Sequence, residues 1–265
     1  MGALAGKGVV VTGGGRGIGR ALAVRATREG ARVVVNDLDD NAARAVAEEI
    51  GGTAAPGDAA SAEGVAALVE AATEALGRID VYVANAGVDG AFGVDSLQAP
   101  DELWARTIDV NVMAHVRAAR ALVPGWLADG LGGRFVVTAS AAGLLTMIGT
   151  APYSVTKHAS VAFAEWLSIT YGYRGIDVHA ICPQGVKTAM LDSAGPLQDL
   201  LTRDGALEPE EVAEAAVAAI EEGRFLVLPH PVIADYYVAR ATDTDRWLRG
   251  MGRLQQKLDE SGLMG

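Results

Sequence analysis

The chain contains one cysteine and four histidines among its 265 residues. No disulfide can therefore form within the chain, and Cys182, at the end of an apolar run, is typical of a small buried residue rather than of a reactive thiol. The histidines are too scattered to indicate a metal cluster, and we expect no catalytic metal. They are His115, His158, His179 and His230.

Basic residues are also scarce. The chain has 22 Lys and Arg against 33 Asp and Glu, which gives a formal net charge of -11, whereas a nucleic-acid binder needs a basic face. No uncharged apolar run approaches the roughly 20 residues of a membrane span, and we expect no signal peptide before the first apolar run. We therefore expect a cytoplasmic protein that binds neither nucleic acid nor a membrane.

Hydrophobic residues are plentiful. They make up 50% of the chain, and charged residues make up 21%, which is typical of a folded globular protein. An α/β fold of this length commonly forms one domain. The sequence contains neither a Pro-, Gly- or Ser-rich linker nor an internal repeat, so we predict a single domain over residues 1–265.

Short apolar runs alternate with longer, Ala-rich stretches of helical spacing. The runs predict strands at residues 9–12, 32–36, 53–56, 81–84, 134–138, 177–181 and 225–228. The longer stretches predict helices at residues 17–29, 41–50, 62–76, 103–128, 151–171 and 209–221. This order is typical of a Rossmann-type α/β fold, a doubly wound parallel sheet with helices on both faces. Outside it lie residues 187–206, interpreted as a mobile substrate lid, and the tail 229–265, for which we expect one or two surface helices.

A glycine-rich turn follows the first predicted strand, where residues 12–19 read Thr-Gly-Gly-Gly-Arg-Gly-Ile-Gly. Glycines allow a tight turn and the close approach of a pyrophosphate, and the next helix offers free N–H groups and the positive end of its dipole. The position after a strand favours dinucleotide binding over a merely tight turn. The candidate cofactor residues are Gly13, Gly15, Arg16, Gly17, Ile18 and Gly19.

Asp37 ends the second predicted strand, close to the roughly 20-residue distance at which a ribose-binding acid follows such a turn. A carboxylate there can accept hydrogen bonds from the adenosine ribose and would repel the extra phosphate of NADP. Leu38 beside it offers no compensating charge, so we predict NAD as the cofactor. Arg16 keeps NADP as the alternative, and Asp37 as a helix-capping or loop acid is the competing interpretation.

The most specific pattern is a tyrosine and a lysine that share one face of a predicted helix. Tyr153 and Lys157 are residues i and i+4, and Ser140 lies upstream of them. Together with the glycine-rich turn, this set resembles the short-chain dehydrogenase/reductase family over about residues 6–228. The resemblance extends to an acid that contacts adenine, to an Asn-Ala-Gly signature that lines the cofactor cleft, and to a helix asparagine. These positions are Asp58, Asn85, Ala86, Gly87 and Asn111.

The resemblance implies an NAD-dependent oxidoreductase that interconverts a secondary alcohol and a ketone by hydride transfer. Tyr153 would be the acid/base; its ordinary pKa is about 10, and both a nearby ammonium and oxidised nicotinamide favour its phenolate. Ser140 would bind the substrate oxygen, and Lys157 would also contact the nicotinamide ribose. Asn111 would hold a water that links Lys157 to solvent, with a purely structural role as the alternative.

One departure from the family pattern follows the sixth predicted strand. Family members usually have Pro-Gly here, whereas this chain inserts Gln184 between Pro183 and Gly185. We expect Pro183, Val186 and Thr188 to contact the nicotinamide end of the cofactor, but the inserted residue leaves the path of this loop open.

Apolar residues flank the expected catalytic group on two sides. Leu144, Leu145 and Met147 lie between the serine and the tyrosine, and Met190 and Leu191 follow the expected nicotinamide contacts. Apolar walls suit a hydrophobic substrate body, and methionine adapts to irregular shapes. We therefore predict a largely apolar secondary alcohol or ketone, bound by Leu145, Met147, Met190 and Leu191. In the competing interpretation these residues only pack the lid onto the sheet.

The family resemblance also implies a homo-dimer or homo-tetramer. The predicted helices 103–128 and 151–171 supply candidate faces. Their alanines either allow close approach of a second chain or pack inside one chain: Ala118, Ala119, Ala159, Ala162 and Ala164.

Two other functions compete with the oxidoreductase. One is a catalytically inactive NAD-binding sensor or scaffold, and the other is dehydration or epimerisation with bound cofactor. Fold alone separates none of these, but the complete catalytic set favours the oxidoreductase.

Overall fold

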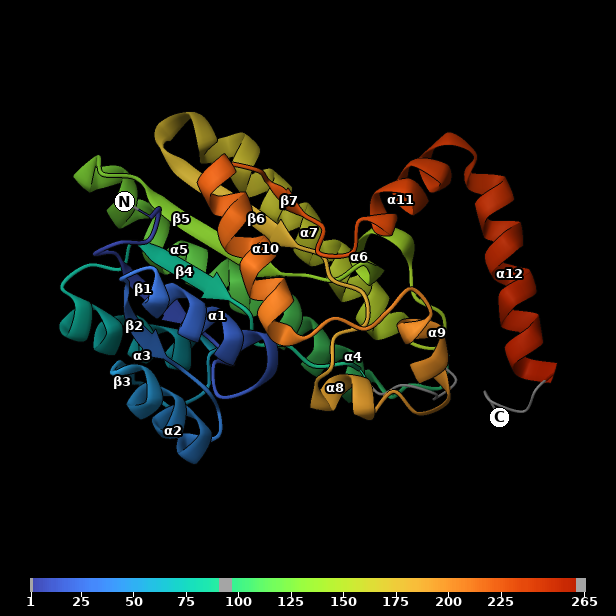
Figure 1. Ribbon diagram of the computed structural model, residues 1–265, viewed down its shortest axis with the longest axis horizontal. Helices are drawn as coiled ribbons and strands as arrows, with labels where there is room; N and C mark the ends of the chain where they lie inside the picture. Colours follow the sequence, from blue (N-terminus) through green and yellow to red (C-terminus); the bar gives the residue numbers. More distant parts are fainter. Residues whose placement is uncertain (1, 91–96, 261–265) are drawn as a thin grey trace.

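A parallel sheet of seven strands forms the centre of the chain in a computed structural model that describes residues 2–90 and 97–260 (Figure 1). The strands lie in the order β3-β2-β1-β4-β5-β6-β7. Because the chain reverses direction across the sheet between β1 and β4, a crevice is expected at the carboxyl ends of these strands. The strands are β1 (Gly8–Val11), β2 (Arg32–Val35), β3 (Thr53–Ala54), β4 (Val81–Ala84), β5 (Gly133–Thr138), β6 (Ile176–Ile181) and β7 (Leu226–Val227).

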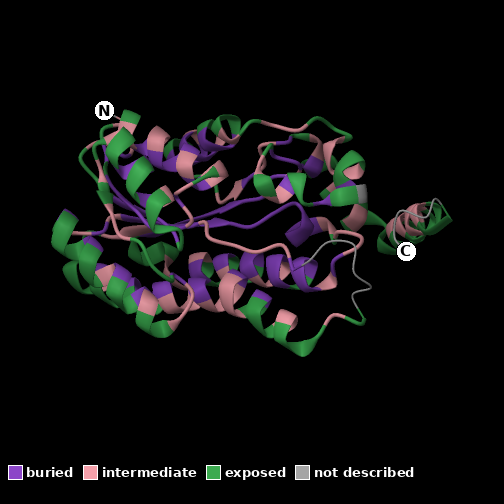
Figure 2. Cartoon of the chain, turned by 90° about the horizontal axis from the view of Figure 1, so that it is seen from below, coloured by how far each residue is buried: buried purple, intermediate pink, exposed green. Residues whose placement is uncertain are grey.

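Helices cover both faces of the sheet. One face packs against α1 (Gly17–Arg28), α2 (Asp40–Ile50) and α10 (Pro209–Glu222). The other packs against α3 (Ala62–Leu76), α5 (Ala114–Asp129) and α7 (Ala151–Tyr171). In Figure 2 the buried strands lie between two helical layers whose outer surfaces are exposed. The predicted doubly wound Rossmann-type fold is therefore confirmed.

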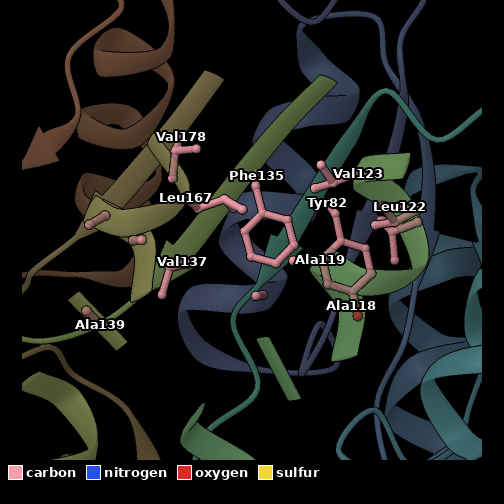
Figure 3. Packing of buried hydrophobic residues seen from close by; sticks show 14 of the residues in the cluster. Tyr82, Ala118, Ala119, Leu122, Val123, Phe135, Val137, Ala139, Leu167 and Val178 are labelled. Carbon is pink, nitrogen blue, oxygen red and sulfur yellow. The ribbon is translucent and has the colours of Figure 1, made fainter. Parts of the chain in front are cut away.

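The strands contribute side chains to both layers because successive residues point to opposite faces. Val9 and Val11 pack on the α1 side, whereas Val10 packs on the α3 side. Tyr82 of β4 and Phe135 of β5 stack with ring centres 5.6 Å apart on that second side (Figure 3). Each large apolar side chain buried in this way contributes about 1.5–3 kcal/mol to folding.

The helix starts follow local capping chemistry. The Asp39 carboxylate accepts hydrogen bonds from the N–H groups of Asn41 and Ala42 at the start of α2. The Ser61 hydroxyl accepts one from Gly64 at the start of α3. Such caps satisfy N–H groups that have no partner within the helix. They fix the helices that follow β2 and β3, and thereby the loops at the carboxyl edge of the sheet.

The helix predicted at residues 103–128 has a different form. It consists of α4 (Asp101–Ile108), a π-helical turn η1 (Asp109–Met113) and α5. The turn contains Asn111, whose carbonyl accepts a hydrogen bond from the Ser160 hydroxyl at 2.7 Å. Hydrophobic spacing could not reveal the wider turn, because the apolar face continues on either side of it. Such turns occur frequently at functional sites.

The segments outside the β/α alternation are helical. Residues 187–206, interpreted from the sequence as a substrate lid, contain α8 (Ala189–Asp192), η3 (Gly195–Leu197) and α9 (Gln198–Thr202). The tail forms α11 (Val232–Thr242) and α12 (Thr244–Glu260). In Figure 1, α12 extends away from the sheet at the right. The remaining short helices are α6 (Ala142–Leu145) and η2 (Gly172–Arg174). Within residues 2–90 and 97–260, no helix is both long and apolar enough to span a membrane.

Candidate active site

The glycine-rich turn between β1 and α1 has a backbone that larger residues would disrupt. Gly13 has φ +60°, and a Cβ added to it would lie 3.0 Å from the Cα of Ala86. A Cβ on Gly19 would lie 2.1 Å from the carbonyl oxygen of Gly13. α1 starts at Gly17, and its N-cap residue, Arg16, makes no side-chain capping hydrogen bond. This close-packed turn and uncapped helix start fit a dinucleotide pyrophosphate.

The residues after β4 fix this turn in place. The Asn85 side chain donates to the carbonyl oxygens of Thr12 and Gly13 at 2.9 and 3.2 Å. The Thr12 hydroxyl accepts from the N–H groups of Asn85 and Ala86, both at 3.0 Å. The Asn-Ala-Gly segment thus joins the ends of β1 and β4 at the crevice.

Asp37 is held against the same turn. Its two carboxylate oxygens accept hydrogen bonds from the N–H groups of Gly15 and Asp39, each at 3.0 Å. The residue is only 6% exposed and lines the cavity described below. Helix capping is performed by Asp39, so Asp37 is not the helix cap of the competing interpretation. The remaining lone pairs of its carboxylate suit the hydroxyl groups of a ribose.

Asp58 lies at the adenine end of the expected cofactor position. Its carboxylate accepts from the N–H groups of Ala60 and Ser61 at 2.8 and 3.2 Å. These hydrogen bonds, that from Ala60 foremost, lower the pKa of the Asp58 carboxyl below its usual value. The residue lines the cavity, and it therefore presents a charged carboxylate to a ligand there.

Tyr153, Lys157 and Ser140 lie together at the carboxyl ends of β5 and β6. The phenol of Tyr153 forms a hydrogen bond with the Ser140 hydroxyl. The ammonium nitrogen of Lys157 lies 5.6 Å from the centre of the Tyr153 ring and donates to the carbonyl oxygen of Thr138 at 2.9 Å. α7 therefore presents the tyrosine and the lysine on one face, toward the serine that follows β5.

Burial dominates the ionisation of this group. It raises the pKa of the Tyr153 phenol above its ordinary value, although the hydrogen bond with Ser140 acts in the opposite direction. Burial also lowers the pKa of Lys157 to about 8. The phenolate favoured in the sequence argument is thus not stabilised by the protein alone, because loss of solvation outweighs the hydrogen bond with Ser140.

Asn111 lies behind these residues and does not line the cavity. Its side-chain oxygen accepts from the N–H of Val88 at 2.9 Å, and its amide donates to the Val88 carbonyl and the Thr156 hydroxyl at 2.9 and 3.0 Å. A Cβ on Gly87 would lie 3.2 Å from Asn111 Oδ1 and 3.4 Å from Lys157 Nζ. Asn111 therefore ties the loop after β4 to α7, and its oxygen and the lysine border one small space.

The loop after β6 turns the inserted residue toward the C-terminal helices. The N–H of Gln184 donates to Nδ1 of His230, and the Gln184 amide donates to the Asp204 carboxylate, both at 3.2 Å. Beyond it, the hydroxyl of Thr188 donates to the carbonyl of Val186 at 3.1 Å. The methyl carbon of Thr188 would lie 3.1 Å from a Cβ on Gly17. The loop therefore returns to the glycine-rich turn despite the insertion.

A cavity of about 1430 Å³ follows the carboxyl edge of the sheet past all of these groups. Every sequence-predicted site residue lines it except Gly15 and Asn111. Leu144, named with the pocket residues, is instead buried in the core. The predicted substrate residues on the cavity wall are Leu145, Met147, Met190 and Leu191.

Sequence reasoning missed the part of the cavity formed by the C-terminal helices. Tyr236 of α11 and Trp247, Met251 and Leu254 of α12 line it. Their helical spacing in the tail was a usable signal, but that spacing does not say where the helix packs. The cavity therefore extends further from Ser140, Tyr153 and Lys157 than predicted.

Cys182 and the histidines have other roles. Burial raises the pKa of the Cys182 thiol to about 12, as expected for an unreactive buried residue. Nδ1 of His179 bonds to the Arg224 carbonyl at 2.7 Å, and Nδ1 of His158 bonds to the Ser154 carbonyl at 2.9 Å. In the described part of the chain, no group of three or more His, Cys, Asp or Glu is arranged to hold a metal ion.

Comparison with known proteins identifies this arrangement. The sequence pattern of the short chain dehydrogenase family matches residues 7–198. The chain is 35% identical over 224 residues to a 1-deoxy-11-beta-hydroxypentalenate dehydrogenase of Streptomyces avermitilis, which covers 82% of each chain. It is 34% identical over 245 residues to a 2,5-dichloro-2,5-cyclohexadiene-1,4-diol dehydrogenase of Sphingobium indicum, which covers 89% of this chain and 98% of the relative.

A solved structure agrees with these relatives. The crystal structure of a short chain dehydrogenase/reductase from Burkholderia phymatum in complex with NAD superposes with a TM-score of 0.85, at 29% identity, and covers 92% of this chain and 96% of that one. The chain therefore belongs to the short-chain dehydrogenase/reductase family. It is a nicotinamide-dependent oxidoreductase that acts on CH–OH groups.

Proposed function

We propose that this protein interconverts a secondary alcohol and a ketone, with NAD(H) as its cofactor and Tyr153 as its acid/base. The observation that supports this most directly is the placement of Tyr153, Ser140 and Lys157 on the wall of the same cavity that the glycine-rich turn borders. Both named relatives are dehydrogenases of hydroxyl-bearing compounds by their names. When bound, the dinucleotide supplies the acceptor or donor of the hydride.

Three residues of the chain then take part in the transfer of the proton. Ser140 donates a hydrogen bond to the substrate oxygen and positions it against Tyr153. The Tyr153 phenolate removes the hydroxyl proton during oxidation, and the phenol returns it during reduction. The Lys157 ammonium stabilises that phenolate electrostatically. All three residues are at most 9% exposed, so each charge acts at a lower dielectric than in bulk water.

NAD rather than NADP is the proposed cofactor. The Asp37 carboxylate is fixed by Gly15 and Asp39 at the cavity wall, where a 2′-phosphate would meet a negative charge. Leu38 beside it is 79% exposed and offers no cation. Arg16, which also lines the cavity, is the residue that would favour NADP. The residues proposed to contact the cofactor are the glycine-rich turn, Asp37, Asp58, residues 85–87, Lys157, Pro183, Val186 and Thr188.

We propose further that the chain assembles with copies of itself through α7. Of the alanines singled out in the sequence, Ala118, Ala119 and Ala164 are buried within one chain and cannot form such a face. The exposed face of α7 instead carries Trp166 and Ile169, which are 51% and 81% exposed. Apolar residues grouped in this way on a surface indicate a contact. Light scattering at micromolar concentration should give a dimer or tetramer, and Ile169→Asp should lower that mass.

A panel of secondary alcohols and ketones with NAD and NADH tests the proposed activity through nicotinamide absorbance. We expect turnover of apolar substrates with NAD. The inactive alternative, an NAD-binding sensor or scaffold, predicts NAD binding by calorimetry without turnover of any alcohol or ketone. That result would contradict the proposed function and leave the family assignment unchanged.

A further inference from the structure

The cavity has a distal part that lies beyond the catalytic residues. Ile233 of α11 and Trp247, Met251 and Leu254 of α12 line it. Leu200 and Leu201, at α9, line the same cavity. The match to the family pattern ends at residue 198, so this part is built by a region of the chain that the family pattern does not describe. We name these six residues the distal compartment.

α12 has an apolar face that the protein itself buries only in part. Trp247, Met251 and Leu254 follow each other at the spacing of one helix face, and each is half-buried. All 17 residues of α12 are described, and none of them is fully buried. An amphipathic helix derives most of its stability from packing of its apolar face. This face therefore gains stability when an apolar group occupies the compartment.

The C-terminal helices are attached to the catalytic part of the molecule at several points. The Tyr236 hydroxyl donates to the two carboxylate oxygens of Asp204 at 3.3 and 3.4 Å. The Arg240 guanidinium donates to the carbonyl of Leu144, in the short helix α6 that follows Ser140. The rings of Tyr236 and Trp247 lie 6.2 Å apart and join α11 to α12. These contacts therefore fix the position of the compartment relative to Ser140.

A buried histidine adds a further attachment. His230 is 3% exposed; its Nδ1 accepts from the N–H of Gln184, and its Nε2–H donates to the Gly205 carbonyl at 3.2 Å. The inserted Gln184 also donates to Asp204. The loop after β6, the end of the segment 187–206 and the start of α11 therefore meet at one polar junction beside the cavity.

We propose that the distal compartment binds an extended apolar body of the substrate, while its hydroxyl or carbonyl group lies between Ser140 and Tyr153. The substrate class is then a long-chain or fused-ring secondary alcohol or ketone rather than a short one. The proposal rests on the proposed function, because it places the reacting carbon at Tyr153. Continuity with the catalytic cavity favours a substrate over a second copy of the chain as the occupant, since the apolar residues of α12 face this cavity.

Ketone binding to the NAD-saturated protein tests the compartment without turnover, because oxidised NAD cannot reduce a ketone. Calorimetry compares 2-butanone with 2-decanone, which differ only in the length of one alkyl chain. Each methylene group buried from water strengthens binding about fourfold. We expect 2-decanone to bind the wild type roughly a hundredfold more tightly, since part of the chain fills the compartment.

Two substitutions and one control locate the effect. Trp247→Ala removes an aromatic wall, and Leu254→Glu introduces a charge into the compartment. We expect each to weaken 2-decanone binding by roughly tenfold or more while 2-butanone binding stays within about twofold. Leu248, on the same helix, is 58% exposed and absent from the cavity wall, so Leu248→Ala should leave both ligands unchanged. Unchanged 2-butanone binding also shows that each variant is folded.

The outcomes separate this proposal from the proposed function. Equal affinity for the two ketones, or equal losses in Leu248→Ala and Leu254→Glu, would overturn the compartment. So would a change of assembly mass in Leu254→Glu without any change in ketone binding, since α12 would then be a contact between copies. Length-dependent binding without oxidation of 2-butanol or 2-decanol would support the compartment and count against the proposed reaction.

Discussion

The carboxylate of Asp37 accepts a hydrogen bond from the backbone N–H of Gly15 at 3.0 Å, so the acid at the end of β2 and the glycine-rich turn after β1 form one unit. A Cβ on Gly15 would lie 2.8 Å from the Asp37 Oδ2 atom, and only glycine permits this contact. The carboxylate proposed to bind the ribose is therefore positioned by the fold before a ligand binds, which is the arrangement that lowers the cost of recognition.

The first prediction concerns cofactor choice. Wild-type protein should use NAD with a higher kcat/KM than NADP, because Asp37 repels a 2′-phosphate. Asp37→Ala should narrow the ratio by roughly tenfold or more, the effect of about 1.4 kcal/mol of lost discrimination. Asp40→Ala, an exposed acid nearby that pairs with Arg44, is the control and should leave the ratio unchanged. A wild type that prefers NADP would refute the assignment.

The second prediction concerns the small space beside Gly87. Alanine there would place a Cβ 3.2 Å from Asn111 Oδ1, so the Asn111 side chain must shift slightly, and 3.4 Å from Lys157 Nζ, which is ordinary contact. Because small displacements of catalytic groups have large effects on rate, Gly87→Ala should lower kcat by roughly tenfold or more. Gly125→Ala, in open space on α5, is the matched control. Equal kcat values for the two variants would show that the space has no catalytic role.

The third prediction follows from the buried Lys157. Its pKa falls from 10.5 to about 8 on burial, so between these values the unfolded chain binds a proton that the folded chain does not. The contribution of Lys157 to folding stability therefore rises with pH from about 8 to 10.5 and is unfavourable below that window. Lys157→Met removes this cost, on the order of 3 kcal/mol at pH 7.

Urea unfolding of wild type and Lys157→Met at pH 7 and pH 10 checks this linkage. The variant should be inactive, and its stability relative to the wild type should be greater at pH 7 than at pH 10. Lys257→Met on the exposed side of α12 is the matched control. A stability difference that does not change with pH, or that grows toward pH 10, would contradict a burial-lowered Lys157.

The fourth prediction concerns residues 187–206, which contain α8 and α9. If this segment closes over the substrate, its amides should exchange slowly only when cofactor and substrate are both bound. Hydrogen exchange on the protein alone and on the ternary complex measures this. The exposed helix start at Asp101 provides an internal reference that should not change. Equal protection of the segment in both states would contradict its interpretation as a lid.

The sequence was sufficient for the elements that position the site. Periodic apolar runs gave β4, α3 and α7 their observed bounds, because buried parallel strands and amphipathic helices impose different periods. The glycine-rich turn could be predicted because glycine at that point is a steric requirement. The placement of Tyr153 and Lys157 on one side of α7 could be predicted because residues i and i+4 share a face of a helix.

Other features depend on tertiary contacts that the sequence does not encode locally. The π-helical turn at Asn111 is supported by Ser160, which comes from a distant helix. Burial sets the direction in which the pKa of Tyr153 shifts, and no local sequence pattern reveals that this side chain is buried. α12 was expected only as a surface helix, since the apolar spacing of Trp247 and Leu254 does not reveal the cavity beside it.

The most direct test of the account is the turnover of Tyr153→Phe. This change removes one hydroxyl group from the cavity wall and leaves the glycine-rich turn and Asp37 in place. NAD should bind with nearly wild-type affinity by calorimetry, while kcat for alcohol oxidation falls by roughly 10²–10⁴-fold, the usual contribution of a positioned acid/base. A variant that keeps more than about a tenth of the wild-type kcat would contradict Tyr153 as the group that transfers the proton.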